Sequence, residues 1–232
     1  MQHKAEIITF AKADNLSPMH IAIAGNIGSG KTTLTTLLAR HYGWTPQFEA
    51  VDDNPYLDDY YKDIPRWSFN LEVFFLRHRF RDMLNIAHSS QTVIQDRSIY
   101  EGVYVFTANN YAMGNLTDRD YETYMELFES MMSVMRLPDL MIYLRASVPH
   151  LVANIQQRGR DYEQTIPLDY LKNLNERYED FIHNKYKGRV LTVGVDTLDF
   201  QNRPQDLASI IDSIDAELFG LFPEDDGQQP TR

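Results

Sequence analysis

Cysteine is absent from the 232-residue sequence, which excludes disulfide bonds and thiolate metal sites and fits the reducing cytoplasm that we expect. Basic residues are few: the sequence holds 22 Lys and Arg but 33 Asp and Glu, which gives a formal net charge of −11. Broad binding to nucleic acid or to an anionic membrane surface needs clustered positive charge. The composition therefore argues against both partners, but it allows a small anion in a local positive pocket.

Long apolar runs are also missing. No stretch approaches the ~20 apolar residues of a membrane helix, and the first residues lack the apolar core of a signal peptide. The histidines show no spacing typical of zinc ligands. The length and ordinary composition fit a single domain, which we place at residues 19–222, between a loose tail at 1–18 and a disordered polar tail at 223–232.

Short apolar segments alternate along the chain with segments of helical periodicity. This alternation predicts an α/β fold of three layers, in which a five-stranded parallel sheet is flanked by helices. The strands are expected at 20–25, 48–51 (the end of the second strand), 92–95, 140–144 and 190–193. The helices are expected at 31–41, 67–87, 117–135 with Thr117 as N-cap, 149–157, 168–185 and 207–219.

The strongest motif follows the first expected strand and opens the first expected helix. Gly25–Thr32 matches the phosphate-loop pattern G-x-x-x-x-G-K-S/T. Its glycines let backbone N–H groups point at phosphate oxygens, and the start of the helix adds a partial positive charge. Lys31 can reach the outer phosphates, and the Thr32 hydroxyl can ligate Mg²⁺. The predicted triphosphate-binding residues are Gly25, Asn26, Ile27, Gly28, Ser29, Gly30, Lys31, Thr32 and Thr33.

Further motifs stand in order after this loop, at 48–56, 66–69, 96–98 and 158–160. Together with the loop they resemble the deoxynucleoside kinase family, and in particular its bacterial deoxyguanosine and deoxyadenosine kinases. The resemblance covers nearly the whole chain. It implies a P-loop kinase-like fold with a short Arg-containing lid at about 154–167. It also implies transfer of the γ-phosphoryl group of ATP to the 5′-hydroxyl of a deoxynucleoside, with Mg²⁺ as cofactor, by a homodimer.

The resemblance assigns catalytic roles to Glu49 and Arg97, beside Lys31 of the phosphate loop. Glu49 stands where the family carries its general base, and Arg97 would contact the 5′-oxygen and the transferred phosphoryl group. Composition alone would place Glu49 on an acidic surface, since residues 49–63 hold six acids against Lys62. The alternative for Arg97 is a structural salt bridge.

Metal and lid residues follow from the same resemblance. Asp96 ends a strand and would hold Mg²⁺, directly or through water. Arg158 and Arg160 would stabilise charge on the phosphoryl group from the lid. Relatives often carry another Arg where this chain has Asn154, which makes the grip of the lid on the donor less certain.

A nucleoside site is implied as well. Tyr61 and Glu163 match the pair that binds the sugar 3′-hydroxyl, and Phe106 matches an aromatic residue that packs against the base. Without the resemblance, Tyr61 and Phe106 would be interpreted as core residues.

Glu72 departs from relatives that carry Gln there, and it bears on the choice of base. An ionised carboxylate only accepts, which suits the adjacent N1–H and N2–H₂ donors of guanine. Arg79, two helical turns on, could donate to O6 and N7. Gly102 stands where mammalian relatives place an Asp, so no carboxylate there competes for Arg79. We expect a purine deoxynucleoside, with guanine preferred to adenine. The alternative is that Glu72 and Arg79 pair with each other or with solvent.

Two other functions stay open. A nucleoside monophosphate kinase would need extra cationic side chains near Tyr61, and the acidic stretch 49–63 speaks against a doubly charged acceptor. A P-loop switch or ATPase without a small-molecule acceptor would leave Glu49 and the sugar-binding pair without a task. The methionine-rich helix around Phe128 fits core packing or a subunit contact.

Overall fold

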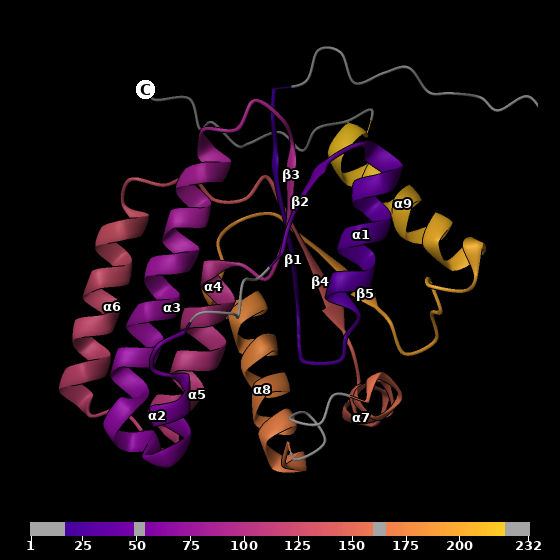
Figure 1. Ribbon diagram of the computed structural model, residues 1–232. Helices are drawn as coiled ribbons and strands as arrows, with labels where there is room; N and C mark the ends of the chain where they lie inside the picture. Colours follow the sequence, from indigo (N-terminus) through magenta and orange to yellow (C-terminus); the bar gives the residue numbers. More distant parts are fainter. Residues whose placement is uncertain (1–16, 49–53, 160–165, 221–232) are drawn as a thin grey trace, which may run out of the picture.

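The structure, a computed structural model, describes residues 17–48, 54–159 and 166–220. The expected tail at 223–232 and nearly all of that at 1–18 lie outside these ranges. A parallel five-stranded sheet forms the centre, as predicted, and the structure shows its strand order to be β2-β3-β1-β4-β5 (Figure 1). Its strands are β1 (His20–Gly25), β2 (Thr45–Gln47), β3 (Val93–Asp96), β4 (Leu140–Arg145) and β5 (Val190–Gly194).

Our prediction of the second strand from the sequence was wrong. We expected it to end in Phe48–Val51, but β2 ends at Gln47 and pairs with β3 through Thr45, Pro46 and Gln47. Because β2 is an edge strand, it needs no apolar run with two buried faces, so its sequence is more polar than the expectation assumed. Phe48 lies after the strand and is exposed, and residues 49–51 lie outside the described ranges.

Alternate residues of the sheet pack into two separate hydrophobic cores, one on each face. Ile21 and Ile23 of β1 pack on one face, beneath α1 (Lys31–Tyr42) and α9 (Pro204–Phe219). Ala22 and Ala24 pack on the other, beneath α3 (Ile64–Ala87), α6 (Asp118–Met132) and α8 (Leu168–Asp180). Figure 1 shows these two helical layers on opposite sides of the sheet. This arrangement is the predicted three-layer α/β fold.

Most helices begin or end within a few residues of their predicted bounds. The side chain of Asp63 accepts from the Arg66 N–H, so α3 begins before Trp67, where we expected its start. Thr117 caps α6 by accepting from the Asp120 N–H, as predicted. The expected helix 168–185 is α8 followed by a π-helical turn, Phe181–Lys185.

Several short helices were not predicted from the sequence. They are α2 (Leu57–Lys62), α4 (Ile99–Glu101), the π-helix η1 (Gly102–Thr107) and α5 (Ala108–Ala112). With α7 (Val148–Arg158), α2 and α5 lie toward the edge of the sheet where the parallel strands end (Figure 1). Open parallel sheets bind their ligands at that edge. None of the helices in the described ranges is both long and apolar enough to span a membrane.

Candidate functional site

The predicted phosphate loop curls between the end of β1 and the start of α1. The Ser29 N–H donates to the Asn26 carbonyl oxygen at 3.1 Å and closes the turn. Gly28 and Gly30 have φ angles of 85° and 93°, which side chains other than glycine rarely adopt. A Cβ at Gly28 would lie 2.8 Å from the Leu151 carbonyl oxygen, so α7 also requires glycine at this position.

Lys31 lies inside this loop. Its Nζ donates to the carbonyl oxygens of Gly25 at 2.7 Å and Asn26 at 3.0 Å, and the side chain is buried. The ammonium group is therefore held where the loop curls around it. That this cation faces phosphate stays a prediction from the motif.

Two asparagines connect the loop to neighbouring helices. The amide of Asn26 donates to the Leu171 carbonyl at 3.0 Å and to Asn175 Oδ1 at 2.6 Å, both on α8. Asn154 on α7 donates to the Gly28 carbonyl at 2.8 Å. The side chain at 154, where relatives often carry Arg, thus supports the loop.

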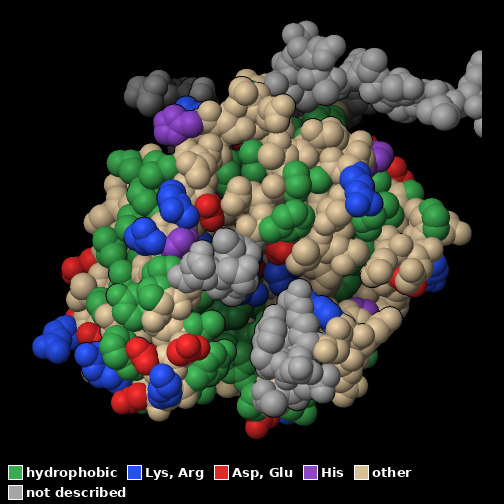
Figure 2. All heavy atoms as spheres, in the orientation of Figure 1, with side chains coloured by type: hydrophobic (Ala, Val, Ile, Leu, Met, Phe, Trp, Pro, Cys, Tyr) green, Lys and Arg blue, Asp and Glu red, His purple; other side chains and the backbone are tan. Residues whose placement is uncertain are grey.

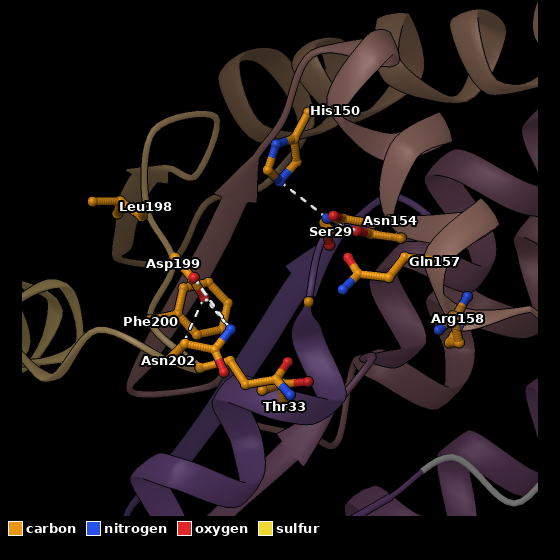
Figure 3. Close-up of a pocket in the computed structure, with 13 residues that line it drawn as sticks. Ser29, Thr33, His150, Asn154, Gln157, Arg158, Leu198, Asp199, Phe200 and Asn202 are labelled. Carbon is orange, nitrogen blue, oxygen red and sulfur yellow. Dashed lines mark hydrogen bonds between the residues drawn. The ribbon is translucent and has the colours of Figure 1, made fainter.

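A pocket of about 640 Å³ opens beside the loop (Figure 3). The loop and α7 form one wall, and the segment between β5 and α9 forms the other. Five of the residues that line it were predicted from the sequence to bind ATP: Gly28, Ser29, Gly30, Thr33 and Arg158. A sixth, Asn154, was noted as standing where relatives often carry Arg. Sequence reasoning missed His150, Gln157, Leu198, Asp199, Phe200, Gln201 and Asn202.

The 198–202 segment shapes this pocket. A Cβ at Gly30 would lie 2.8 Å from Phe200 Cζ, so the aromatic ring rests directly on the loop. Asp199 Oδ1 accepts from both the backbone N–H and the side-chain amide of Asn202, as Figure 3 shows. No local motif marks these residues, because their role comes from packing against a loop far away in sequence.

Thr32, in the first turn of α1, meets Asp96 at the end of β3. The Thr32 hydroxyl donates to Asp96 Oδ2 at 2.5 Å, which brings the two predicted metal ligands together. Mg²⁺ prefers oxygen ligands, and one or two carboxylates with phosphate oxygens and water suffice to hold it. The pair fits that ion, although the described residues contain no cluster of three His, Asp or Glu.

Arg97 follows Asp96 in a strained turn. Its φ is 69°, and it is the one residue other than glycine with a positive φ in the described ranges. Strain of this kind persists where the surrounding structure holds it, often at functional sites. The Arg97 guanidinium carbon lies 4.4 Å from the centre of the Phe106 ring, so two of the predicted residues are in contact.

Glu72 is buried within a network of donors. Its Oε2 accepts from the Thr107 hydroxyl at 2.7 Å, and its Oε1 accepts from the Asn110 amide at 2.6 Å. Burial raises the pKa of the Glu72 carboxyl, while the two hydrogen bonds and the charge of Arg79 oppose the rise. Thr107 and Asn110 were not identified from the sequence.

Arg79 is also buried on α3. Its guanidinium carbon lies 5.1 Å from the centre of the Phe75 ring. A Cβ at Gly102 would lie 2.7 Å from Arg79 Nη1, so any side chain at that position would meet the guanidinium. Residues 79 and 102 are thus neighbours, as the resemblance implied.

The tyrosines of α2 differ in their surroundings. Tyr61 is 70% exposed, whereas Tyr60 is partly buried and donates to Asn110 Oδ1 at 3.4 Å. The described contacts bring Tyr60 into the Glu72 network, while Tyr61 keeps its predicted role at the sugar 3′-hydroxyl as an expectation. The other predicted residues Glu49, Arg160 and Glu163, with the middle of the lid, lie outside the described ranges.

Figure 2 shows the same side of the molecule with its atoms filled in. The surface is hollowed near the centre, and Lys and Arg side chains lie inside the hollow. A protein with a net charge of −11 thus directs some of its few cations inward. That arrangement favours a small anionic ligand.

This chain is similar in sequence and fold to known proteins. It is 36% identical over 196 residues to the deoxyadenosine/deoxycytidine kinase of Bacillus subtilis (strain 168), covering 84% of this chain and 90% of that one. It is 37% identical over 204 residues to the deoxyguanosine kinase of the same strain, covering 84% and 95%. The deoxyadenosine kinase of M. mycoides, solved with bound dATP, matches with a TM-score of 0.73 and 29% identity, over 85% of this chain and 100% of that one.

The family model for deoxynucleoside kinases matches residues 21–219, which span the whole sheet and both helical layers. The match includes the phosphate loop, the Thr32–Asp96 pair and the strained Arg97 turn. Motifs, fold and site agree, and the chain belongs to the deoxynucleoside kinase family.

Proposed function

We propose that this kinase transfers the γ-phosphoryl group of ATP to the 5′-hydroxyl of a purine deoxynucleoside, with deoxyguanosine preferred to deoxyadenosine. The observation that carries the choice of base is the hydrogen bonding of Glu72. Both oxygens of its carboxylate accept from donors, Thr107 and Asn110, that hold the group in place.

The orientation of Asn110 is fixed from its other end. Its Oδ1 accepts from the Tyr60 hydroxyl at 3.4 Å and from the Asn115 amide at 3.1 Å. The Asn110 amide N–H₂ is therefore turned toward Glu72. A Gln at position 72 would bring its own N–H₂ group either against the Asn110 amide or against Thr107, whose hydroxyl would then have to turn from donor to acceptor. The network thus suits a carboxylate that accepts at both oxygens.

Guanine complements such a carboxylate. Each carboxylate oxygen keeps lone pairs beyond the bond it already accepts, and guanine presents N1–H and N2–H₂ side by side. Arg79 lies on the same helix and supplies N–H donors for O6 and N7. Adenine offers an acceptor at N1, which an ionised carboxylate does not satisfy.

The phosphoryl transfer would use the cations that the motifs predicted. Lys31, Arg97 and Arg158 would stabilise negative charge on the transferred group, together with Arg160. Glu49 would accept the 5′-hydroxyl proton. Thr32 and Asp96 would hold Mg²⁺, which when bound neutralises charge on the β- and γ-phosphates.

The remaining predicted residues would position the two nucleosides. The pocket beside the loop has room for the nucleoside of ATP, with Phe200 as its aromatic wall. Phe106 would pack against the acceptor base next to Arg97. Tyr61 and Glu163 would bind the sugar 3′-hydroxyl.

The base preference is tested by steady-state phosphorylation of deoxyguanosine and deoxyadenosine. We expect a higher kcat/KM for deoxyguanosine, and we expect Glu72→Gln to shift the ratio toward deoxyadenosine by ~10-fold or more, because buried mismatched donors are strongly rejected. Glu126→Gln, an exposed change on α6, is the matched control and should leave the ratio unchanged. A wild-type preference for deoxyadenosine would refute the proposal.

The same assay separates the two rival functions. ADP release is measured without acceptor, with deoxynucleosides, and with deoxyguanosine monophosphate. A monophosphate kinase would respond to the last alone, and an ATPase or switch would respond to none. We expect release only with the unphosphorylated nucleosides.

We also propose a homodimer, as the resemblance implied. Three apolar side chains around the C-terminal end of α6, Leu127, Val134 and Leu137, are exposed, and a second copy would cover them. Light scattering should give twice the mass of the chain. Val134→Asp should shift the mass toward one chain, and a wild-type monomer would contradict the proposal.

A further inference from the structure

Glu101 is a completely buried carboxylate outside the predicted site. It closes the short helix α4, and its exposed fraction is 0%. Its Oε2 accepts from the Ser98 backbone N–H at 2.8 Å and from the Ser98 hydroxyl at 3.3 Å. Its Oε1 accepts from the Tyr178 hydroxyl at 2.9 Å and from the Gly25 backbone N–H at 3.3 Å.

These partners belong to three separate parts of the site. Gly25 is the first residue of the phosphate loop. Ser98 follows the strained Arg97, so the bond to its N–H holds the far side of that turn. Tyr178 lies on α8, the helix that also binds Asn26 of the loop. One carboxylate therefore connects the loop, the Arg97 turn and α8.

The charge of Glu101 fits this place as well as its hydrogen bonds do. Burial raises the pKa of the Glu101 carboxyl, and the nearby positive charges of Lys31 and Arg97 oppose the rise. An ionised Glu101 gives the two cations a fixed counter-charge. Removing the charge of Glu101 would take this counter-charge from both cations.

We propose that Glu101 is a positioning residue, which holds the start of the phosphate loop and the Arg97 turn at the spacing that phosphoryl transfer requires. It acts through Gly25 and Ser98 rather than on a substrate. Misplacement of reacting groups by about 1 Å can cost ~10²-fold in rate, so such a brace affects turnover directly.

Glu101→Gln tests this role with little change in volume. The Gln carbonyl oxygen can still accept from Ser98, but the amide nitrogen has no lone pair for the Gly25 N–H. We expect kcat to fall by ~10- to 100-fold, while the KM for the deoxynucleoside changes by less than about threefold. The acceptor is whichever purine deoxynucleoside the wild type phosphorylates faster, so the result does not depend on the base preference.

Two stacked tyrosines provide a second variant and its matched control. The rings of Tyr178 and Tyr143 lie 5.9 Å apart at 14°, and each hydroxyl donates to one carboxylate. Tyr178 donates to Glu101, whereas Tyr143 donates to Glu179 at 3.0 Å. Tyr178→Phe should lower kcat by roughly 3- to 10-fold, because it removes one of the four hydrogen bonds that hold the carboxylate, and Tyr143→Phe should leave kcat within twofold.

Thermal unfolding of each variant gives the folded fraction at the assay temperature, by which kcat is corrected. Glu101→Gln and Tyr178→Phe should also be non-additive when combined, because both act on the same carboxylate. A corrected kcat equal to that of the wild type in Glu101→Gln overturns the proposal. So do equal losses in Tyr178→Phe and Tyr143→Phe, or a loss confined to the KM for the deoxynucleoside.

Discussion

Gly28→Ala probes how closely α7 packs against the phosphate loop. Gly28 has a φ of 85°, and a Cβ there would lie 2.8 Å from the Leu151 carbonyl oxygen and 3.0 Å from Ile155 Cγ1. Gly114→Ala is the matched control. Gly114 has a φ of 76°, but nothing lies within 4 Å of an added Cβ. The two substitutions share the backbone cost, and only the first carries the clash.

The magnitude follows from these two terms. A left-handed conformation costs an alanine about 1–2 kcal/mol, and for a chain of this size each kcal/mol lowers Tm by roughly 2–4 °C. Gly114→Ala should therefore lower Tm by roughly 2–8 °C and leave kinetics intact. In Gly28→Ala, α7 must also withdraw by about 0.6 Å, from 2.8 Å to the 3.4 Å of ordinary contact.

That withdrawal moves Asn154 and Arg158, which line the donor pocket from α7. We expect kcat/KM for ATP to fall by ~10- to 100-fold in Gly28→Ala, because sites tolerate displacements of only about 0.5 Å. The assay is ADP release at saturating deoxynucleoside, with thermal unfolding in parallel. If Gly28→Ala had the same kinetics as Gly114→Ala, the inference that close packing of α7 on the phosphate loop positions the donor pocket would be refuted.

Three further predictions concern the chemistry. Glu49→Gln should lower kcat by ~10²–10⁴-fold with a smaller effect on ATP binding, measured by titration, and unchanged turnover would remove Glu49 as the base. Asp96→Asn should raise the Mg²⁺ concentration needed for half-maximal activity, and an unaltered Mg²⁺ titration would argue against its metal role. Because burial raises the pKa of Glu72, its ionised form is lost as pH falls, beginning above the usual value of 4.5. The KM for deoxyguanosine should rise over that acidic range in the wild type but not in Glu72→Gln, and parallel pH profiles would contradict this reading.

The features that the sequence predicted well depend on neighbours along the chain. Gly25–Thr32 is a contiguous motif, so its glycines and Lys31 could be identified without any knowledge of packing. The Thr117 cap of α6 is likewise a local bond, between residues three apart. The prediction that the second strand ends at 48–51 was wrong, because an edge strand lacks the apolar run that marks a central strand.

Side chains on one short helix show the limit of this reasoning. Tyr60 and Tyr61 are adjacent, and about 100° of helical rotation separates them, so only one can face a given neighbour. The described contacts bring Tyr60 to Asn110, whereas Tyr61 is largely exposed. The roles given to Glu49, Tyr61, Arg160 and Glu163 came from the resemblance, and the described residues leave them as proposals.

The sequence by itself determined that this chain is an α/β protein with a phosphate loop, few cations and a kinase motif order, because each of those signals is local or compositional. Only the tertiary structure decided which distant groups complete the site. Tyr178 reaches Glu101 across 77 positions, and Asn154 reaches Gly28 across 126. Phe200 rests on Gly30 in the same way. Such contacts arise when parallel strands bring their ends to one edge of the sheet, and no pattern in neighbouring residues records them.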